Sequence, residues 1–463
     1  MKNSTPIDTV PRGNVYQWTP DSLRPLGGYL TVGKVPLPRL EAFGEGPVRL
    51  WGQYVRVRNA GEVNEPVLAE GVTRIVPIGN AAPNANRDFM FNPGRGGGRI
   101  DKVNWDGSSA SAEFLESGVP FPESQFRSRY IEAAHFGEVN TYFHLDFMAA
   151  YIDSLLRELG APSLPRATAI VNAHHAVTSR GSIRDGVPRG DRWLPFQGGH
   201  YRLPAAHYDL EEHEPISPDG EIHLGPGRNL LQYGALVEAA GGPYRANASH
   251  NAGILYHEYG HHLTRHTADF RANALQAPTR QNNRKVAIDE GMCDYFAATM
   301  LSTPHIWAWH LRHDEEVTHP RSLSSSKTMA VYDASPTADA HANGTIWGAA
   351  LWDLRSELSR SETDGVRRTD LMVVQSLLLL GRLVDTSSEK AVNGIRRLRQ
   401  NFGTGAATML WADQLLHSGR HRELILSSFS RRGIQPRDIR EVQAASVGQE
   451  QSTEPAEIRS GAN

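Results

Sequence analysis

Residues 253–267 read GILYHEYGHHLTRHT, and this stretch decides the fold because it places a metal-binding pattern on a helix. His257, Glu258 and His261 spell H-E-x-x-H. Residues four apart lie one turn above each other on a helix, so His257 and His261 can offer two imidazole nitrogens to one metal ion. Glu258 then lies beside the ion rather than on it, which suits a base acting on a metal-bound water.

The same stretch also carries an apolar face. Leu255, Tyr259 and Leu263 recur every four residues, offset from the two histidines, and therefore predict a face that packs on a core. The alternative is an ordinary helix that carries histidines by chance, since the chain has 20 of them. The motif and its helical context together favour the metal site.

Composition sets wide bounds on the class of protein. The 463 residues are enough for two or three domains, and 39% apolar with 21% charged residues is typical of a globular protein. A net charge of -3 without a sustained basic run predicts neither a nucleic-acid nor a membrane partner. The single cysteine, Cys293, excludes an internal disulfide framework and a cysteine-based zinc site.

Targeting signals give little information on compartment. The longest apolar stretch, residues 371–380, is too short to span a bilayer. The first residues lack the apolar core of a secretory signal peptide. The sequence therefore predicts either a cytoplasmic protein or a precursor that starts elsewhere.

The first part of the chain reads as strands and turns. Short β-branched or alternating stretches at residues 29–35, 48–57 and 72–78 predict an N-terminal β-rich region over residues 1–125. The glycines of residues 94–98 are expected to form a flexible turn, because the lysine of a phosphate-binding loop is absent.

Helical spacing begins near residue 126. We expect a helix over residues 134–160 and a buried strand over 167–172, inside a catalytic α/β lobe that spans residues 126–270. His174 and His175 are interpreted as turn histidines. The acidic stretch 208–221, which contains His213, is expected to be a solvated loop, with a calcium site there left open.

The remaining sequence is mainly helical. We expect a helical lobe over residues 271–440 and a disordered tail over 441–463. The helices are expected at residues 286–301, 341–358, 369–384, 390–402, 406–417 and 422–432.

A catalytic zinc ion needs a third protein ligand. Glu290 lies on the expected helix 286–301, and Asp294 follows four residues later on the same face. This spacing suits a ligand plus a carboxylate that orients a ligand imidazole. An exposed acidic face is the alternative, but the helix is otherwise apolar. His262 points away from His257 on the helix, and His266 is one residue out of step with the third histidine of the metzincin pattern, so neither is expected to bind the metal.

Three stretches, HEYGH at 257–261, EGMCD at 290–294 and DAHANGTIW at 339–347, resemble in order the signatures of gluzincin metallopeptidases. The likeness is to the thermolysin and fungalysin families, and with weaker matches at 139–144 and 431–434 it spans about residues 126–435. It implies an α+β fold, with the N-terminal β-rich region followed by a thermolysin-like zincin catalytic unit made of an α/β lobe and a mainly helical lobe. It also implies secretion.

The resemblance also implies roles for individual residues. His257, His261 and Glu290 would bind one Zn2+, and Glu258 would transfer a proton from the zinc-bound water to the leaving amine. Asp294 would orient a ligand histidine, and His341 would donate to the oxyanion.

Two features depart from the thermolysin pattern. No tyrosine lies between His261 and Glu290, and Tyr332 is a candidate substitute from another loop. Asp339 lies two residues before His341, closer than the acidic partner of that histidine in the family, which leaves its role open.

These observations predict a zinc metalloendopeptidase whose partner is a peptide or protein substrate. One alternative is a gluzincin aminopeptidase, although the sequence lacks the Gly-Ala-Met-Glu-Asn stretch that holds a free amine. The other is a non-catalytic peptide-binding protein on a protease scaffold. The substrate and oligomeric state stay open.

Overall fold

The computed structural model describes fifteen segments of the chain. These are residues 10–20, 28–41, 49–63, 75–93, 123–177, 183–184, 187–188, 192–202, 217–226, 240–241, 247–270, 283–306, 321–335, 338–383 and 400–443. The chain divides into two compact units. Unit 1 comprises residues 1–154, 163–262 and 296–322, and unit 2 comprises residues 155–162, 263–295 and 323–463.

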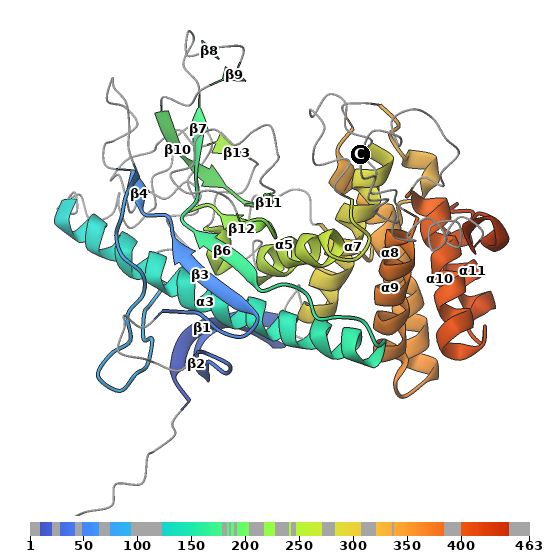
Figure 1. Ribbon diagram of the computed structural model, residues 1–463, viewed down its shortest axis with the longest axis horizontal. Helices are drawn as coiled ribbons and strands as arrows, with labels where there is room; N and C mark the ends of the chain where they lie inside the picture. The colour runs from blue at the N-terminus through green and yellow to red at the C-terminus, as the bar shows by residue number, and fades with distance from the viewer. Residues whose placement is uncertain are drawn as a thin grey trace, which may run out of the picture. The chain divides into compact units, whose positions relative to one another are not determined.

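A four-stranded mixed sheet forms the centre of unit 1 (Figure 1). Its strands lie in the order β11 (Gly199–Arg202), β12 (Glu221–Leu224), β6 (Ala167–Val171) and β3 (Val55–Asn59). Strand β6 is buried along its whole length, as its run of Ala, Ile and Val predicts for a central parallel strand. Strand β11 pairs antiparallel with β12 and forms one end of the sheet.

The other strands of unit 1 form smaller sheets. β1 (Arg12–Pro20) and β2 (Gly28–Pro36) form an antiparallel hairpin, and β10 (Arg192–Gln197) lies between β7 (His174–Val177) and β13 (Ala240–Gly241). Two short pairs complete the set: β4 (Glu62–Val63) with β5 (Ile75–Val76), and β8 (Ile183–Arg184) with β9 (Val187–Pro188).

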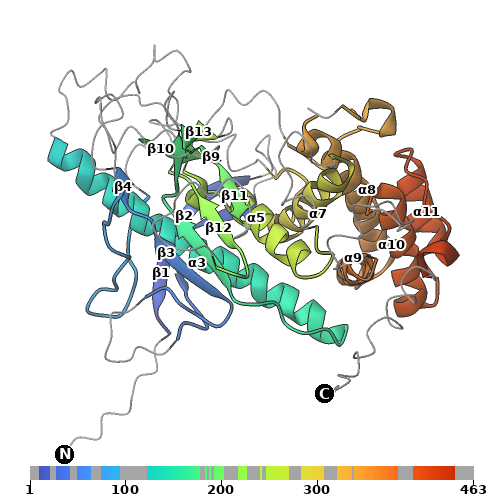
Figure 2. The ribbon, with the colours of Figure 1, turned by 45° about the horizontal axis from the view of Figure 1, so that its top comes forward.

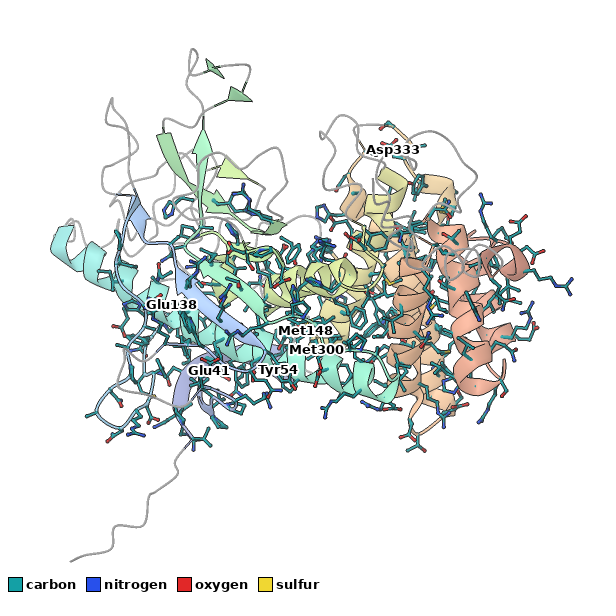
Figure 3. All side chains as sticks on the ribbon, in the orientation of Figure 1. Glu41, Tyr54, Glu138, Met148, Met300 and Asp333 are labelled. Atoms are coloured by element: carbon teal, nitrogen blue, oxygen red, sulfur yellow. The ribbon has the colours of Figure 1, made fainter. Side chains whose placement is uncertain are left out.

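Helix α3 (Glu123–Glu158) runs beside the central sheet (Figure 1). Its side chains bond to the last residue of β3, to the residue before that strand and to Ala81. The Tyr54 hydroxyl donates to Asp153 Oδ2 at 2.8 Å, and the buried Glu138 accepts from Asn59 Nδ2 at 2.7 Å and from the Ala81 amide at 2.9 Å. Figure 3 labels Tyr54 and Glu138. These bonds fix the sheet against the helix.

Helix α5 (Ala252–Arg265) follows the 3-10 turn η1 (Ala248–His250). Asn251 starts it by accepting from the amides of Gly253 and Ile254. Two bonds from α3 hold this region: Asn140 Nδ2 donates to the Ser249 carbonyl at 2.8 Å, and His144 Nδ1 lies 2.7 Å from the Tyr256 hydroxyl. Leu255, Tyr259 and Leu263 are buried as predicted. The helix is therefore fixed at its start and along one face.

Unit 2 is built from helices. These are the first part of α7 (Asn283–Leu301), α8 (Ala340–Ser361), α9 (Gly365–Gly381), α10 (Phe402–His417) and α11 (Arg422–Ser430), with the 3-10 turn η3 (Met329–Val331) before α8. α9 packs on α8 and α10, and α11 also packs on both of these helices (Figure 1). Buried polar side chains bridge the helices: the Tyr295 hydroxyl donates to Asp370, and the hydroxyls of Ser376 and Thr408 lie 2.7 Å apart.

Helices α7 and α8 meet main chain to main chain through glycines. A Cβ added to Gly291 would lie 2.5 Å from the Gly344 carbonyl oxygen, and one added to Gly348 would lie 2.9 Å from the Gly291 carbonyl oxygen. A Cβ on Gly344 would lie 2.9 Å from the Gly291 nitrogen. Only glycine allows this approach, which brings Glu290 on α7 close to His341 on α8.

The fold class is confirmed, since N-terminal strands precede a helical region in an α+β arrangement. Helices are present where six of them were predicted, at residues 252–265, 283–301, 340–361, 365–381, 402–417 and 422–430, and the predicted buried strand is present at 167–171. Helix α3 begins before the predicted residue 134, β3 begins only at Val55, and strand β1 was not predicted. The division of the chain at residues 125, 270 and 440 stays a prediction.

Several expectations fall on other parts of the chain. The turn at 94–98, the loop at 208–216 with His213, most of the helix at 390–402 and the tail from 444 onward lie outside the described residues. Among the described helices, none is long and apolar enough to cross a membrane.

Candidate metal centre

Helix α5 presents the two predicted histidine ligands together. The rings of His257 and His261 lie one turn apart, with centroids 5.0 Å apart and planes at 87°. Glu258 is 5% exposed, so its carboxylate is largely shielded from water. The spacing four residues apart on one helix produces this arrangement, as the sequence predicts.

A third donor comes from α7. His257, His261 and Glu290 each offer one ligand atom, and these atoms lie within 4.8 Å of one another. Two donors on one zinc ion lie at most about 4.2 Å apart, because Zn–N and Zn–O bonds are about 2.1 Å long. Two imidazoles and one carboxylate are a donor set typical of catalytic zinc and leave a coordination position open. The residues therefore fit a zinc ion after small side-chain rotations.

His341 lies at the start of α8 between two carboxylates. Its Nε2 is 3.1 Å from Glu290 Oε2, and its Nδ1 is 3.0 Å from Asp339 Oδ1. Asp339 is also the N-cap of α8, since the same Oδ1 accepts from the His341 amide at 2.9 Å. The short spacing of Asp339 and His341 thus serves two purposes: it caps the helix and holds the histidine ring.

Asn343 fixes the loop that precedes α8. Its Oδ1 accepts from the Asp333 amide at 3.0 Å, and its Nδ2 donates to the Asp333 carbonyl at 2.7 Å. Figure 3 labels Asp333 beside this end of the helix. The ring of Tyr332, the preceding residue, packs edge to face with that of Phe402, with centroids 5.8 Å apart. The loop that carries Tyr332 is therefore tied to the helix that carries His341.

Asp289 belongs to the same region, although the sequence motifs do not indicate it. It accepts from the Thr264 hydroxyl at 2.6 Å and from Cys293 Sγ at 3.7 Å. One ligand atom from each of His261, Asp289 and Cys293 lies within 4.8 Å of the others. Its position directly before Glu290 was the available signal, because a carboxylate adjacent to a ligand is often placed to orient another ligand.

Two neighbouring histidines, His262 and His266, were not expected to bind the metal. His262 is buried, with Nε2 2.9 Å from the Pro165 carbonyl oxygen and Nδ1 3.1 Å from the Tyr201 hydroxyl. His266 is half-buried at the end of the helical segment. Neither belongs to a group of possible metal ligands among the described residues. Asp294 is fully buried on α7, and its role toward a ligand histidine stays a prediction.

A fold of this class with a His-His-Glu donor set defines a zinc metallopeptidase, a hydrolase. The family model of the fungalysin metallopeptidases (M36) matches residues 11–437, and the chain belongs to this family. The resemblance drawn from the sequence motifs is thereby confirmed, and it extends into the N-terminal region. No curated protein matches the chain.

Proposed function

We propose that this protein is a zinc metalloendopeptidase in which Glu258 is the general base and His341 supports the oxyanion. The observation that carries the proposal is the gathering of His257, His261 and Glu290 within 4.8 Å, with Glu258 next in sequence to the first ligand. A zinc ion bound there would polarise the scissile carbonyl and lower the pKa of water to about 7.

Glu258 is placed to move a proton. Its carboxylate is buried on α5 and directly follows a ligand histidine, so it lies beside the position of attack without being needed as a ligand. In the proposed reaction Glu258 accepts the proton of the attacking water, holds it, and then donates it to the nitrogen of the departing amine. One carboxylate therefore serves first as base and then as acid.

His341 is placed to donate a hydrogen bond. Asp339 holds its Nδ1, so Nε2 is the nitrogen that faces the ligand carboxylate of Glu290. In the imidazolium form both ring nitrogens donate, so Nδ1 can bond Asp339 while Nε2 donates to the oxygen that becomes negative in the tetrahedral state. That bond would stabilise charge that is absent from the substrate. We propose that Tyr332, on the loop that Asn343 ties to the same helix, adds a second donor.

Two carboxylates would orient the ligand histidines. Asp294 lies one turn after Glu290 on α7 and is fully buried, and Asp289 lies within reach of His261. A carboxylate bonded to one ring nitrogen of a histidine fixes the tautomer that leaves the other nitrogen as a ligand. We therefore propose that Asp294 and Asp289 position the ligand histidines.

We also propose that the protein is secreted, as expected for its family.

The variant Glu258→Gln tests the proposal directly. It keeps the shape of the side chain and removes the base, so the purified protein should retain one zinc per chain while kcat falls by about 1,000-fold or more. A variant that keeps both its zinc and its turnover would disprove the role of Glu258.

Peptides with free and with blocked N-termini separate the enzyme classes. Cleavage of both, at internal bonds, is the expected result. Exclusive cleavage at free N-termini would establish an aminopeptidase instead. Tight peptide binding without turnover in the zinc-loaded parent protein would establish a binding protein.

A further inference from the structure

Gly199, on strand β11, lies directly against the side chain of Glu258, the proposed catalytic carboxylate. Gly199 is the first residue of this strand and pairs with Leu224 of β12. Figure 2 shows β11 beside α5, the helix that carries Glu258. The sequence signal is the Gly198-Gly199 pair where β10 ends and β11 begins, which the H-E-x-x-H pattern does not include.

A side chain on Gly199 would collide with two residues of α5. An added Cβ would lie 2.7 Å from Ile254 Cγ2, 2.8 Å from Glu258 Cγ and 3.0 Å from Glu258 Oε1. Ile254 and Glu258 are 7% and 5% exposed, so both side chains are packed on most sides. A β-branched side chain on a helix is also nearly fixed in one rotamer. Even a methyl group must therefore displace the carboxylate or the strand.

Backbone conformation does not explain this glycine. Gly198 has φ of 98°, a value that strongly favours glycine, and it makes the turn into β11. Gly199 has no such positive φ, so its backbone would accept any residue type. The lack of a side chain at position 199 is required only by the close approach to α5.

We propose that Gly199 is a positioning residue for the reaction. Because Gly199 has no side chain, Cγ and the carboxylate of Glu258 can lie directly against β11. This contact holds the carboxylate in place. The proposal rests on the role of Glu258 proposed above, but the packing contact between the two residues can be tested without turnover.

The first test is Gly199→Ala, measured by zinc content and steady-state kinetics. The variant should bind one zinc per chain and lose kcat by about tenfold to 100-fold, since a displacement near 1 Å has effects of that size. KM should change far less than kcat, because the shifted group acts on the transition state rather than on bound substrate. Gly33→Ala is the matched control: an added Cβ there also meets a side chain, Gln17, on a strand of the same unit, and kcat should be unchanged.

The second test is a double-mutant cycle on thermal stability. Glu258→Ala removes Cγ and Oε1, two of the three atoms nearest to the new methyl group. Gly199→Ala should therefore lower Tm less in the Glu258→Ala background than in the parent. If Gly199→Ala alone does not fold, recovery of a folded double variant supports the contact, and failure to recover contradicts it.

Equal Tm losses in both backgrounds, or an unchanged kcat in Gly199→Ala, would overturn the proposal. Full turnover in Glu258→Ala would instead overturn the proposed function, while the stability cycle would still report on the contact. The two failures are thus distinguishable.

Discussion

Replacing Asp339 by asparagine and by alanine separates its two contacts with His341. The Oδ1 atom of Asp339 accepts from the His341 amide at 2.9 Å and lies 3.0 Å from Nδ1 of the same residue. Asparagine keeps an oxygen that can cap the helix but loses the charge that holds the ring. Alanine loses both the cap and the charge.

The expected magnitudes follow from these contacts. Asp339→Ala should lower the free energy of unfolding by about 1 kcal/mol, the usual cost of losing an N-cap, whereas Asp339→Asn should leave it nearly unchanged. A loss of 1 kcal/mol corresponds to a fall in Tm of about 1 °C in a chain of this size. The Asp339 side chain is 64% exposed, and solvent weakens its hold on the ring, so kcat/KM should fall only about two- to fivefold in both variants.

Calorimetry and peptide hydrolysis at several pH values would measure the two effects separately. Equal Tm losses in Asp339→Asn and Asp339→Ala would show that the capping bond does not stabilise α8. Parental kcat/KM in both variants would refute the claim that Asp339 orients His341 for the reaction.

Three further outcomes are expected. Removal of the metal by chelation should abolish peptide hydrolysis, and one equivalent of zinc should restore it, as followed by metal content and turnover. Burial lowers the pKa of His144 to about 4, against about 6.5 in an unfolded chain. Between these pH values the unfolded state binds more protons than the folded state. The stability of the fold should therefore decrease as the pH drops from about 6.5 to 4. His144→Gln should flatten that decline in Tm, and an unchanged slope would show that another group causes it. Tyr332→Phe should lower kcat with little change in KM, and a kcat equal to that of the parent would exclude its hydroxyl from the oxyanion site.

The helices that carry the proposed ligands could be predicted from local patterns. In α5 the apolar residues Leu255, Tyr259 and Leu263 recur at helical spacing, and the two histidines use the same spacing. The apolar run in α7 likewise places Glu290 on a buried helix. Both inferences need only residues within a few turns of one another.

Contacts between distant segments could not be predicted. Gly199 lies 59 residues before Glu258, and no local pattern relates a strand glycine to the side chain of a later helix. Strand β3 pairs with β6 more than 100 residues away, which the short alternating pattern near Val55 does not indicate. The dual role of Asp339 was present in the sequence as an N-cap residue two positions before a histidine, but only the bond to Nδ1 identifies its second role.

The glycine crossing of α7 and α8 has a consequence for genetic suppression. Gly291 and Gly344 face each other with main-chain atoms, so neither partner has a side chain that a second mutation could trim. At Gly199, in contrast, the opposing atoms belong to the side chains of Ile254 and Glu258. Selection for regained activity should therefore return mainly true revertants at codons 291 and 344, whereas an inactive Gly199 variant can also be rescued by a smaller residue at position 254.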